Sequence, residues 1–364
     1  MIKPPHIASA VSSLSSVGGE EDPTQASSLS TFLARLVRGE NLSRDDASQF
    51  LKCLLDSEAT DAQVAAALVA LAMKGETVEE LVGIASGMRS RAVRLKTNHQ
   101  RFLDTAGTGS SNAKTFNVST AAAFVIAGAG LAVAKHGNRA VTSRSGSSDV
   151  LTALGVRVTA SPNISEECLN ELGICFMFAP LYHGTTARVA AIRREMRVRT
   201  IFNLLGPLTN PAGAPYQLVG VSTAALVEPL AQALAALGTK QAWVVHGLDG
   251  LDEITLAEST LVAEAKDGLV RTFELKPEDF GLRRASLDGL AGGDAETSAR
   301  IINEVFSRQR ADAARDLVIA NAAAGLLIGG AAADLREAAE LAATSIDNGA
   351  AATKLAELVE ATNR

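Results

Sequence analysis

The chain has 364 residues, of which 47% are hydrophobic and 20% charged, a composition typical of a soluble globular protein with a large core. At about 150 residues per domain, this length predicts two domains or one large domain. The formal net charge of −6 excludes a generally basic surface that coats DNA, and an aromatic content of 4% argues against binding of single-stranded nucleic acid by base stacking. We therefore expect no nucleic-acid partner.

Cysteine usage and apolar runs indicate the compartment. Cys53, Cys168 and Cys175 are odd in number and form no C-x-x-C pair, so we expect neither a disulfide framework nor a thiolate zinc site. The longest nearly apolar run, residues 121–134, is too short to span a bilayer. The N-terminus lacks the basic segment and apolar block of a secretory signal. We expect a cytoplasmic protein with no membrane partner.

The N-terminal third divides into a tail and a helical part. Residues 1–28 are rich in Ser, Gly and Pro and lack a sustained apolar period, which predicts a disordered tail. Helical patterns dominate residues 29–98, which we expect to form a helical domain with a helical return near residues 183–205.

Capping patterns define the helices of that domain. Ser43 is the expected N-cap of one helix, and Gly75 is expected to end another. The pairs Thr60–Gln63 and Thr77–Glu80 have the spacing of capping boxes.

Residues 99–364 alternate short β-type runs, Gly-rich turns and Ala-rich helical stretches, which predicts an α/β domain with a mostly parallel central sheet. We expect strands near residues 101–105, 131–134, 176–179 and 242–246, and helices near residues 119–129 and over most of 296–361. Residues 183–203 are helical and Arg-rich, and Pro207 and Pro211 are expected to close them off.

A glycine-rich turn, Gly107-Thr-Gly109, follows the first expected strand and precedes a helix. Glycines there let backbone N–H groups approach an anion, and the helix start adds a favourable dipole. The turn fails the dinucleotide fingerprint, because Asn112 replaces its third glycine, and no G-K-[ST] of a P-loop follows.

Two further segments are typical of an anion pocket. Thr115, Asn117, Ser119 and Thr120 cluster at the expected helix N-terminus; one of them suffices as an N-cap, so the cluster favours a phosphate cradle. The segment from Lys135 to Arg144 carries four potentially cationic side chains and no carboxylate, whereas a solvated charge run mixes signs.

An Arg-rich helix and an acidic loop complete the candidates. Arg193 lies among five arginines between residues 188 and 199, most of which we expect to face solvent or form ion pairs, while one could bind a substrate carboxylate. Asp252 and Glu253 follow an expected strand and suit Mg²⁺ shared with substrate phosphates. Without the phosphate-type motifs, an acidic surface turn would be the simpler interpretation.

The segments GTG…TFNVST, KHGNR…SGSSDVLTALG, RTIFNLLGPLTNPAG and HGLDGLDEITL resemble, in order and spacing, the motifs of the anthranilate phosphoribosyltransferase family. The resemblance runs from about residue 30 to the C-terminus. It implies a small helical domain beside an α/β domain of the nucleoside phosphorylase/phosphoribosyltransferase type, and a homodimer. It also implies the transfer of phosphoribose from 5-phosphoribosyl 1-pyrophosphate (PRPP) to anthranilate, in tryptophan biosynthesis.

The resemblance also implies residue roles. PRPP would be bound by Gly107, Gly109, Ser110, Ser111, Thr115, Asn117, Val118, Ser119, Thr120, Lys135, His136, Gly137, Asn138, Arg139, Ser143 and Ser147. Anthranilate would meet Gly107, Asn138 and Arg193, with His136 and Pro207 along its path. Ser119, Asp252 and Glu253 would hold Mg²⁺, as two ions of which one arrives with PRPP. We expect no essential general base; His136 is the one candidate, with a structural histidine as the equal alternative.

The sequence departs from the family pattern twice. Ser110, Ser111 and Asn112 replace the usual Gly, Asp and Gly of GTGGDG, and His183-Gly-Thr-Thr-Ala187 stands where the family has H-P-A-M-K. Two alternatives share the fold. A nucleoside phosphorylase would not need the paired Asp252 and Glu253, and a non-catalytic nucleic-acid-binding relative would show a basic surface and lost carboxylates.

Overall fold

The computed structural model of the chain describes residues 28–109, 115–139, 145–288, 290 and 292–364. The expected tail lies outside these residues apart from Ser28, as do Ser110, Ser111 and Ser143 among the expected PRPP ligands. No helix of the described ranges has the length and apolar character needed to cross a membrane.

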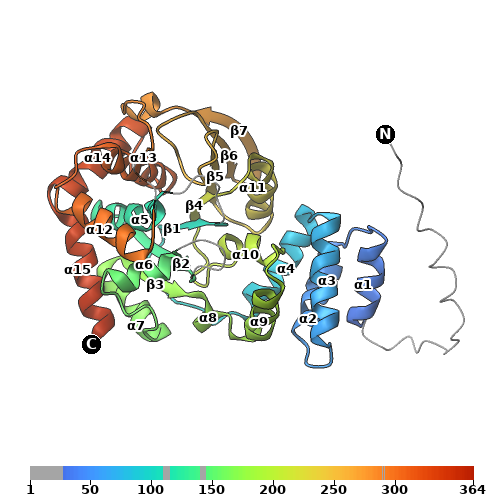
Figure 1. The fold of residues 1–364 in the computed structure, drawn as a ribbon. Coiled ribbons are helices and arrows are strands. Elements are labelled where there is room, and N and C mark those ends of the chain that lie inside the picture. Colours follow the sequence, from blue (N-terminus) through green and yellow to red (C-terminus); the bar gives the residue numbers. More distant parts are fainter. Residues whose placement is uncertain (1–27, 110–114, 140–144, 289, 291) are drawn as a thin grey trace, which may run out of the picture.

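Four helices form a bundle at one end of the molecule (Figure 1): α1 (Leu29–Val37), α2 (Arg44–Leu55), α3 (Asp61–Lys74) and α4 (Val78–Arg91). The capping predictions are confirmed. Ser43 Oγ accepts from Asp46 N, both capping boxes are formed, and Gly75 ends α3 with φ 88°. Helix α9 (Ala187–Met196) packs against α2 and α3, so a later part of the chain joins the bundle.

The larger part is built on a seven-stranded sheet of order β3-β2-β1-β4-β5-β6-β7. The strands are β1 (Phe102–Gly107), β2 (Ala132–Gly137), β3 (Ile174–Phe178), β4 (Tyr216–Gly220), β5 (Gln241–Gly247), β6 (Thr260–Lys266) and β7 (Leu269–Leu275). The pairings from β3 to β5 are all parallel, and β6 and β7 add an antiparallel edge. The predicted mostly parallel sheet is confirmed; β4, β6 and β7 were not foreseen.

Helices cover both faces of the sheet (Figure 1). One face packs against α5 (Val118–Gly128), which is covered in turn by α13 (Ala313–Ile328), α14 (Leu335–Asp347) and α15 (Ala350–Asn363). The other face packs against α10 (Phe202–Leu208) and α11 (Val227–Ala236). The remaining helices are α6 (Ser147–Ala153), α7 (Pro162–Glu167), η1 (Cys168–Leu172), α8 (Ala179–Tyr182), η2 (Gly184–Thr186), η3 (Ala224–Leu226), η4 (Pro277–Phe280) and α12 (Ala295–Phe306).

The alternating directions of side chains along the strands divide the hydrophobic core into two parts. Leu218 and Trp243 belong to the core under α5 and α13, whereas their neighbours Val219 and Val244 belong to a second core. This second core continues through α10 and α11 into the helical bundle. Because side chains of a strand point alternately to the two faces, the central strands tie the bundle to the α/β part.

The helical stretch expected over residues 183–203 is interrupted, which corrects the prediction. Helix α9 ends at Met196, and Arg197 adopts a left-handed φ of 53° before α10 begins at Phe202. Pro207 does not precede the end of the helix but lies inside α10, in its last turn. A proline there removes one intrahelical hydrogen bond, and α10 stops one residue later.

Candidate functional site

Four neighbouring strands end in glycine at the same edge of the sheet. Gly107, Gly137, Gly220 and Gly247 are the last residues of β1, β2, β4 and β5. The chain leaves β1 towards β2 on one side and returns as β4 on the other side. Ligands of open α/β sheets bind in the crevice at such a reversal of strand order. The carboxyl ends of these strands are therefore the candidate site.

Close backbone approaches explain two of these glycines. A Cβ on Gly220 would lie 1.7 Å from the carbonyl oxygen of Asp252, and a Cβ on Gly137 would lie 2.2 Å from Ser147 Oγ. A side chain does not fit at either position. The missing side chains bring the acidic loop against β4 and the start of α6 against β2.

The N-terminus of α5 faces the acidic loop. Ser119 N donates to Glu253 Oε1 at 3.1 Å, and Asn117 Oδ1 accepts from Ser145 Oγ at 3.2 Å. The expected side-chain N-cap is wrong for the described residues: Asn117 holds the N-cap position without a capping bond, and the Glu253 carboxylate takes a helix N–H instead. Thr120 Oγ1 is buried without a partner in the described part of the chain, and Val118 is buried.

The acidic pair has the chemistry of a divalent-cation ligand. Burial, followed by the charge of Asp252, raises the pKa of Glu253 to about 8, against the opposing effects of Lys135 and Ser119. A cation would relieve the repulsion between the Asp252 and Glu253 carboxylates. Carboxylate oxygens are also the donors that Mg²⁺ prefers. Within the described ranges no three His, Cys, Asp or Glu side chains are grouped to hold a metal. Two carboxylates fit a Mg²⁺ whose other ligands are substrate phosphate oxygens.

Lys135 lies beneath the site. Its ammonium is buried and donates to the Thr105 carbonyl and, at 3.1 Å, to Thr105 Oγ1. Thr105 Oγ1 in turn donates to Ser119 O at 2.9 Å. Burial lowers the pKa of Lys135, while Asp104 and Glu253 oppose that change. The Lys135 amino group thus stands under the N-terminus of α5, and Asp104 and Glu253 favour its charged form.

His136 faces α10. Its Nδ1 is 3.1 Å from the Gly206 carbonyl, so Nδ1 carries the proton and Nε2 is the free acceptor. That Nε2 is buried without a partner among the residues described. Burial, with smaller effects of His183 and Lys135, lowers the pKa of His136 to about 3. The ring is therefore neutral at pH 7.

The polar residues after β2 lie at the surface. Asn138 and Arg139 are exposed, and the Arg139 guanidinium lies 5.9 Å from the Phe178 ring centroid. Asn138 Oδ1 accepts from Arg139 N at 2.8 Å. Ser147 is the first residue of α6, beside Gly137. Thr115 is half-buried just before α5, with its hydroxyl on the Phe116 carbonyl.

Arg193 lies on the α9–α10 side of the site. Its Nη2 donates to Asn203 Oδ1 at 3.1 Å, and its guanidinium stacks 5.3 Å from the Phe202 ring centroid. Nε is buried without a partner in the described part, and burial lowers the pKa of Arg193. Arg188, from the same arginine-rich segment, instead pairs with Asp61 of the bundle at 2.6 Å. Pro207 is buried in α10, next to the Gly206 carbonyl that His136 contacts.

Sequence reasoning named Arg199 only as one member of the arginine-rich segment and missed Ser222. Arg199 Nη2 donates to the Gly109 carbonyl and to Ser222 Oγ, at 3.3 Å each, and so links the glycine-rich turn to the segment after β4. The sequence signal that points to Ser222 is the short run Tyr216–Gly220 after Pro215, which forms β4.

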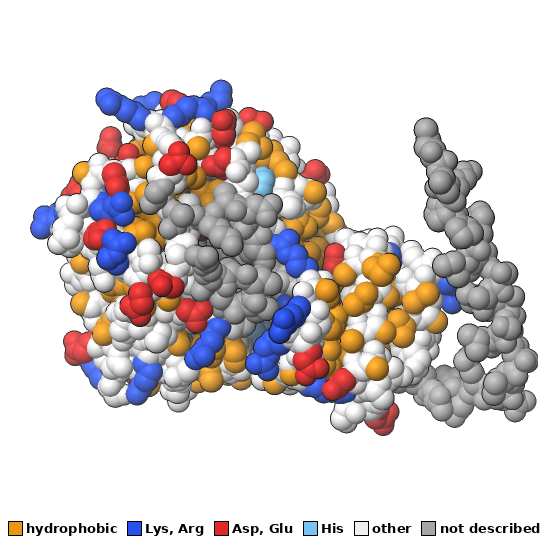
Figure 2. Space-filling view, in the orientation of Figure 1, with side chains coloured by type: hydrophobic (Ala, Val, Ile, Leu, Met, Phe, Trp, Pro, Cys, Tyr) orange, Lys and Arg blue, Asp and Glu red, His pale blue; other side chains and the backbone are white. Residues whose placement is uncertain are grey.

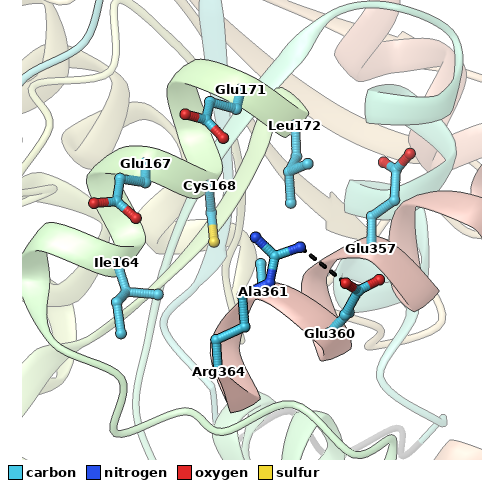
Figure 3. A pocket seen from close by; sticks show the side chains of 9 residues that line it. All are labelled: Ile164, Glu167, Cys168, Glu171, Leu172, Glu357, Glu360, Ala361 and Arg364. Carbon is cyan, nitrogen blue, oxygen red and sulfur yellow. Dashed lines mark hydrogen bonds and ion pairs between the residues drawn. The ribbon is translucent and has the colours of Figure 1, made fainter.

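A cavity of about 160 Å³ lies elsewhere, between η1 and α15 (Figure 3). Because η1 directly precedes β3, this cavity is at the amino end of the strands. Its polar lining is dominated by Glu167, Glu171, Glu357 and Glu360, and Arg364 Nη2 donates to Glu360 Oε1 at 2.8 Å. An acidic lining repels phosphate groups. By contrast, Figure 2 shows Lys and Arg side chains gathered at the border between the α/β part and the bundle.

Models of a known protein family match most of the chain. Residues 99–352 match the a/b domain of the glycosyl transferase family, and residues 30–92 match the helical bundle domain of that family. A protein of Moorella thermoacetica named anthranilate phosphoribosyltransferase is 51% identical over 91% of this chain and 97% of its own. One of the same name from Anaeromyxobacter dehalogenans is 54% identical over the same shares.

Solved structures of proteins with the same name are similar to this structure. Anthranilate phosphoribosyltransferase from Thermus thermophilus superimposes with a TM-score of 0.85 at 38% identity, covering 92% of this chain and 99% of that one. The Saccharomyces cerevisiae enzyme in complex with PRPP and Mg gives 0.84 at 26% identity, covering 92% and 98%. The resemblance and fold class inferred from the sequence are confirmed: the chain belongs to the anthranilate phosphoribosyltransferase family.

Proposed function

We propose that this chain transfers the phosphoribosyl group of PRPP to the amine of anthranilate and releases pyrophosphate, as a step of tryptophan biosynthesis. The observation that carries the proposal is the meeting of Ser119 at the α5 N-terminus, the buried Lys135 and the Asp252–Glu253 pair at one edge of the sheet. The names of the relatives favour this reaction over a nucleoside phosphorylase or a nucleic-acid-binding protein.

PRPP would lie across the strand ends. Gly107 and Gly109 present no Cβ to PRPP, and the dipole of α5 favours an anion at its N-terminus. Exposed Asn138 and Arg139 would reach the phosphates from β2, and Lys135 would supply a buried positive charge from below. The remaining predicted PRPP ligands are Ser110, Ser111, Thr115, Asn117, Val118, Ser119, Thr120, His136, Gly137, Ser143 and Ser147.

Asp252 and Glu253, with the Ser119 hydroxyl, would hold Mg²⁺. When bound, the cation neutralises charge on the departing pyrophosphate. We propose two ions, one of them arriving with PRPP. The complex of the yeast relative with PRPP and Mg supports the binding of Mg²⁺ by this family.

Anthranilate would enter between α9, α10 and β2. The Arg193 guanidinium can pair with its carboxylate as a planar fork, and Gly107 and Asn138 would meet it from the PRPP side. His136 and Pro207 would line its path. Held this way, the amine of anthranilate points towards the ribose carbon C1.

The reaction requires little base catalysis. An aromatic amine is neutral at pH 7 and attacks C1 as the C1–pyrophosphate bond breaks; the amine then loses its proton. The developing charge is on the pyrophosphate and on the ribose, and preorganised N–H groups and cations stabilise the former. Neutral His136 has a free acceptor at Nε2 and could take that proton. A purely structural role of this ring remains the alternative.

The decisive assay incubates the purified chain with PRPP, anthranilate and MgCl₂ and follows the loss of anthranilate fluorescence. Phosphate with nucleosides replaces the substrates in the parallel assay for a phosphorylase. Activity only in the second assay would overturn the proposal. We further propose that the chain is cytoplasmic and forms a homodimer; sedimentation of the purified chain tests the homodimer.

A further inference from the structure

Strands β1 and β2 separate before they reach the site. Their pairing, within ranges that the structure describes completely, consists of Phe102 with Ala132 and Leu103 with Val133. By contrast, β1 stays paired with β4 as far as Gly107. Likewise, β2 stays paired with β3 as far as Gly137. The sheet is therefore open between β1 and β2 directly beneath the candidate site.

Asp104 and Asn210 bind the open backbone groups of β2, while Lys135 Nζ donates to the Thr105 carbonyl of β1. The backbone N–H of His136 donates to Asp104 Oδ1 at 3.1 Å, and the carbonyl of Ala134 accepts from Asn210 Nδ2 at 2.9 Å. Asn210 Nδ2 also donates to Asp104 Oδ2 at 2.7 Å. The Asp104–Asn210 pair thus takes over the hydrogen bonds that a continued ladder would make.

Both side chains are buried, with Asp104 0% and Asn210 4% exposed. Asn210 Oδ1 accepts from Ala212 N at 2.9 Å, so every polar atom of its amide group is used. A buried carboxylate is costly, and burial raises the pKa of Asp104 to about 6. An apolar pair would fill the space at lower cost but could not hold the two open backbone groups.

The segment that leads into Asn210 is itself fixed from several sides. Four consecutive carbonyls at the end of α10 each accept a hydrogen bond from a side chain of a different segment. The pairs are Gly206 with His136 Nδ1 (3.1 Å), Pro207 with Gln217 Nε2 (2.7 Å), Leu208 with Arg89 Nε (2.6 Å) and Thr209 with His183 Nε2 (3.2 Å). These contacts fix the end of α10. Because Asn210 follows directly and binds in the opening between β1 and β2, α10 is tied to that opening.

We propose that Asp104 and Asn210 are positioning residues for the phosphoribosyl transfer. They hold β1 and β2 at the separation that lets Gly107–Gly109 and Lys135–Asn138 face one PRPP molecule, and they tie this separation to α10 on the anthranilate side. The inference rests on the proposed function. Because reactive groups must be aligned closely, an error of about 1 Å can cost about 100-fold in rate.

The first test is Asp104→Asn, which sets an amide against the Asn210 amide while keeping an acceptor for His136 N. We expect kcat to fall at least tenfold and the KM values for PRPP and anthranilate to change less than threefold. The matched control is Glu264→Gln, another carboxylate buried in the sheet, which accepts from Trp243 Nε1 at 2.9 Å. It should lower the melting temperature and leave kcat within twofold.

The second test is the exchange Asp104→Asn with Asn210→Asp. In the exchanged pair the amide of residue 104 donates to the carboxylate of residue 210, and its oxygen still accepts from His136 N. The Ala134 carbonyl loses its donor and faces a carboxylate oxygen of residue 210 instead, so the recovery is partial. We expect kcat to recover at least fivefold over Asp104→Asn.

Each outcome either supports or overturns the inference. A folded Asp104→Asn enzyme with kcat within twofold of the unchanged chain overturns the inference, as does a folded exchange variant with no recovery. If Asp104→Asn does not fold, the smaller change Asn210→Ser takes its place. A fall of at least tenfold in its kcat then supports the inference, and a kcat within twofold of the unchanged chain overturns it. An unchanged chain inactive with PRPP and anthranilate overturns the proposed function itself, and the positioning role with it.

Discussion

The backbone N–H of Ser119 and the carboxylate of Glu253 meet at 3.1 Å, although 134 residues separate them in the chain. The contact places a carboxylate where a phosphate would also bind, at the N-terminus of α5. Once ionised, Glu253 repels a phosphate at this place unless a cation lies between them. This relationship makes the metal requirement directly testable.

Replacing Asp252 with Asn and Glu253 with Gln together should abolish most of the activity while the chain remains folded. The loss of the cation-binding charge should cost about 3 kcal/mol of transition-state stabilisation. Steady-state kcat at saturating PRPP, anthranilate and Mg²⁺ measures the effect, and circular dichroism checks the fold. Full activity of the double variant, or of the unchanged chain in EDTA, would contradict the assignment.

Arg193→Ala should raise KM for anthranilate and leave KM for PRPP nearly unchanged. A charge-assisted hydrogen bond accounts for about 1.5–3 kcal/mol, and the contacts of Arg193 are to Asn203 and Phe202 rather than to the glycine-rich turn. The control is Arg194→Ala, since Arg194 is exposed and points about 100° away on the same helix. Equal weakening of both substrates, or a larger effect at Arg194, would show that the anthranilate site is misplaced.

His136 should make the fold sensitive to acid. Its folded pKa of about 3 is below the ordinary value of about 6.5, so below pH 6.5 the unfolded chain binds the additional proton. The stability that the neutral ring contributes is complete above pH 6.5 and is lost as the pH falls towards 3. At pH 5 the loss is about 2 kcal/mol.

The variant His136→Asn keeps a donor for the Gly206 carbonyl and removes this titration. The free-energy gap between the unchanged chain and His136→Asn, measured by urea unfolding, should shrink by about 2 kcal/mol between pH 7.5 and pH 5. Asp104, whose raised pKa of about 6 acts in the opposite direction, is present in both proteins and cancels. His183 and Lys135, whose charged forms lower the pKa of the ring, also stay unchanged. A gap independent of pH would contradict the buried neutral state.

Gly220→Ala should disturb the acidic loop. The added Cβ would lie 1.7 Å from the Asp252 carbonyl oxygen, so the loop must move, at about 1–3 kcal/mol of stability. The Mg²⁺ concentration that gives half-maximal activity should rise as well. Gly184→Ala is the control, because its Cβ meets nothing within 4 Å. Equal melting temperatures and Mg²⁺ requirements for the two variants would refute the packing argument.

The sequence by itself determined the local structure and the family. Ser43 with Asp46, and Thr60 with Gln63, could be assigned because such capping bonds join residues three positions apart. The strand ending in Gly107 and the mostly parallel sheet followed from apolar runs and turns. The motifs, which occur in the family's order, identified the family and with it the reaction that we propose.

Only the tertiary structure decided which distant groups meet. The contacts of Glu253 with Ser119 and of Asn210 with Asp104 depend on the strand order and on where β1 separates from β2. The break at Arg197 and the burial of His136 depend on packing between α9, α10 and the sheet. Local patterns record hydrogen bonds within a few residues, whereas these positions are set by long-range pairing and by the desolvation it imposes.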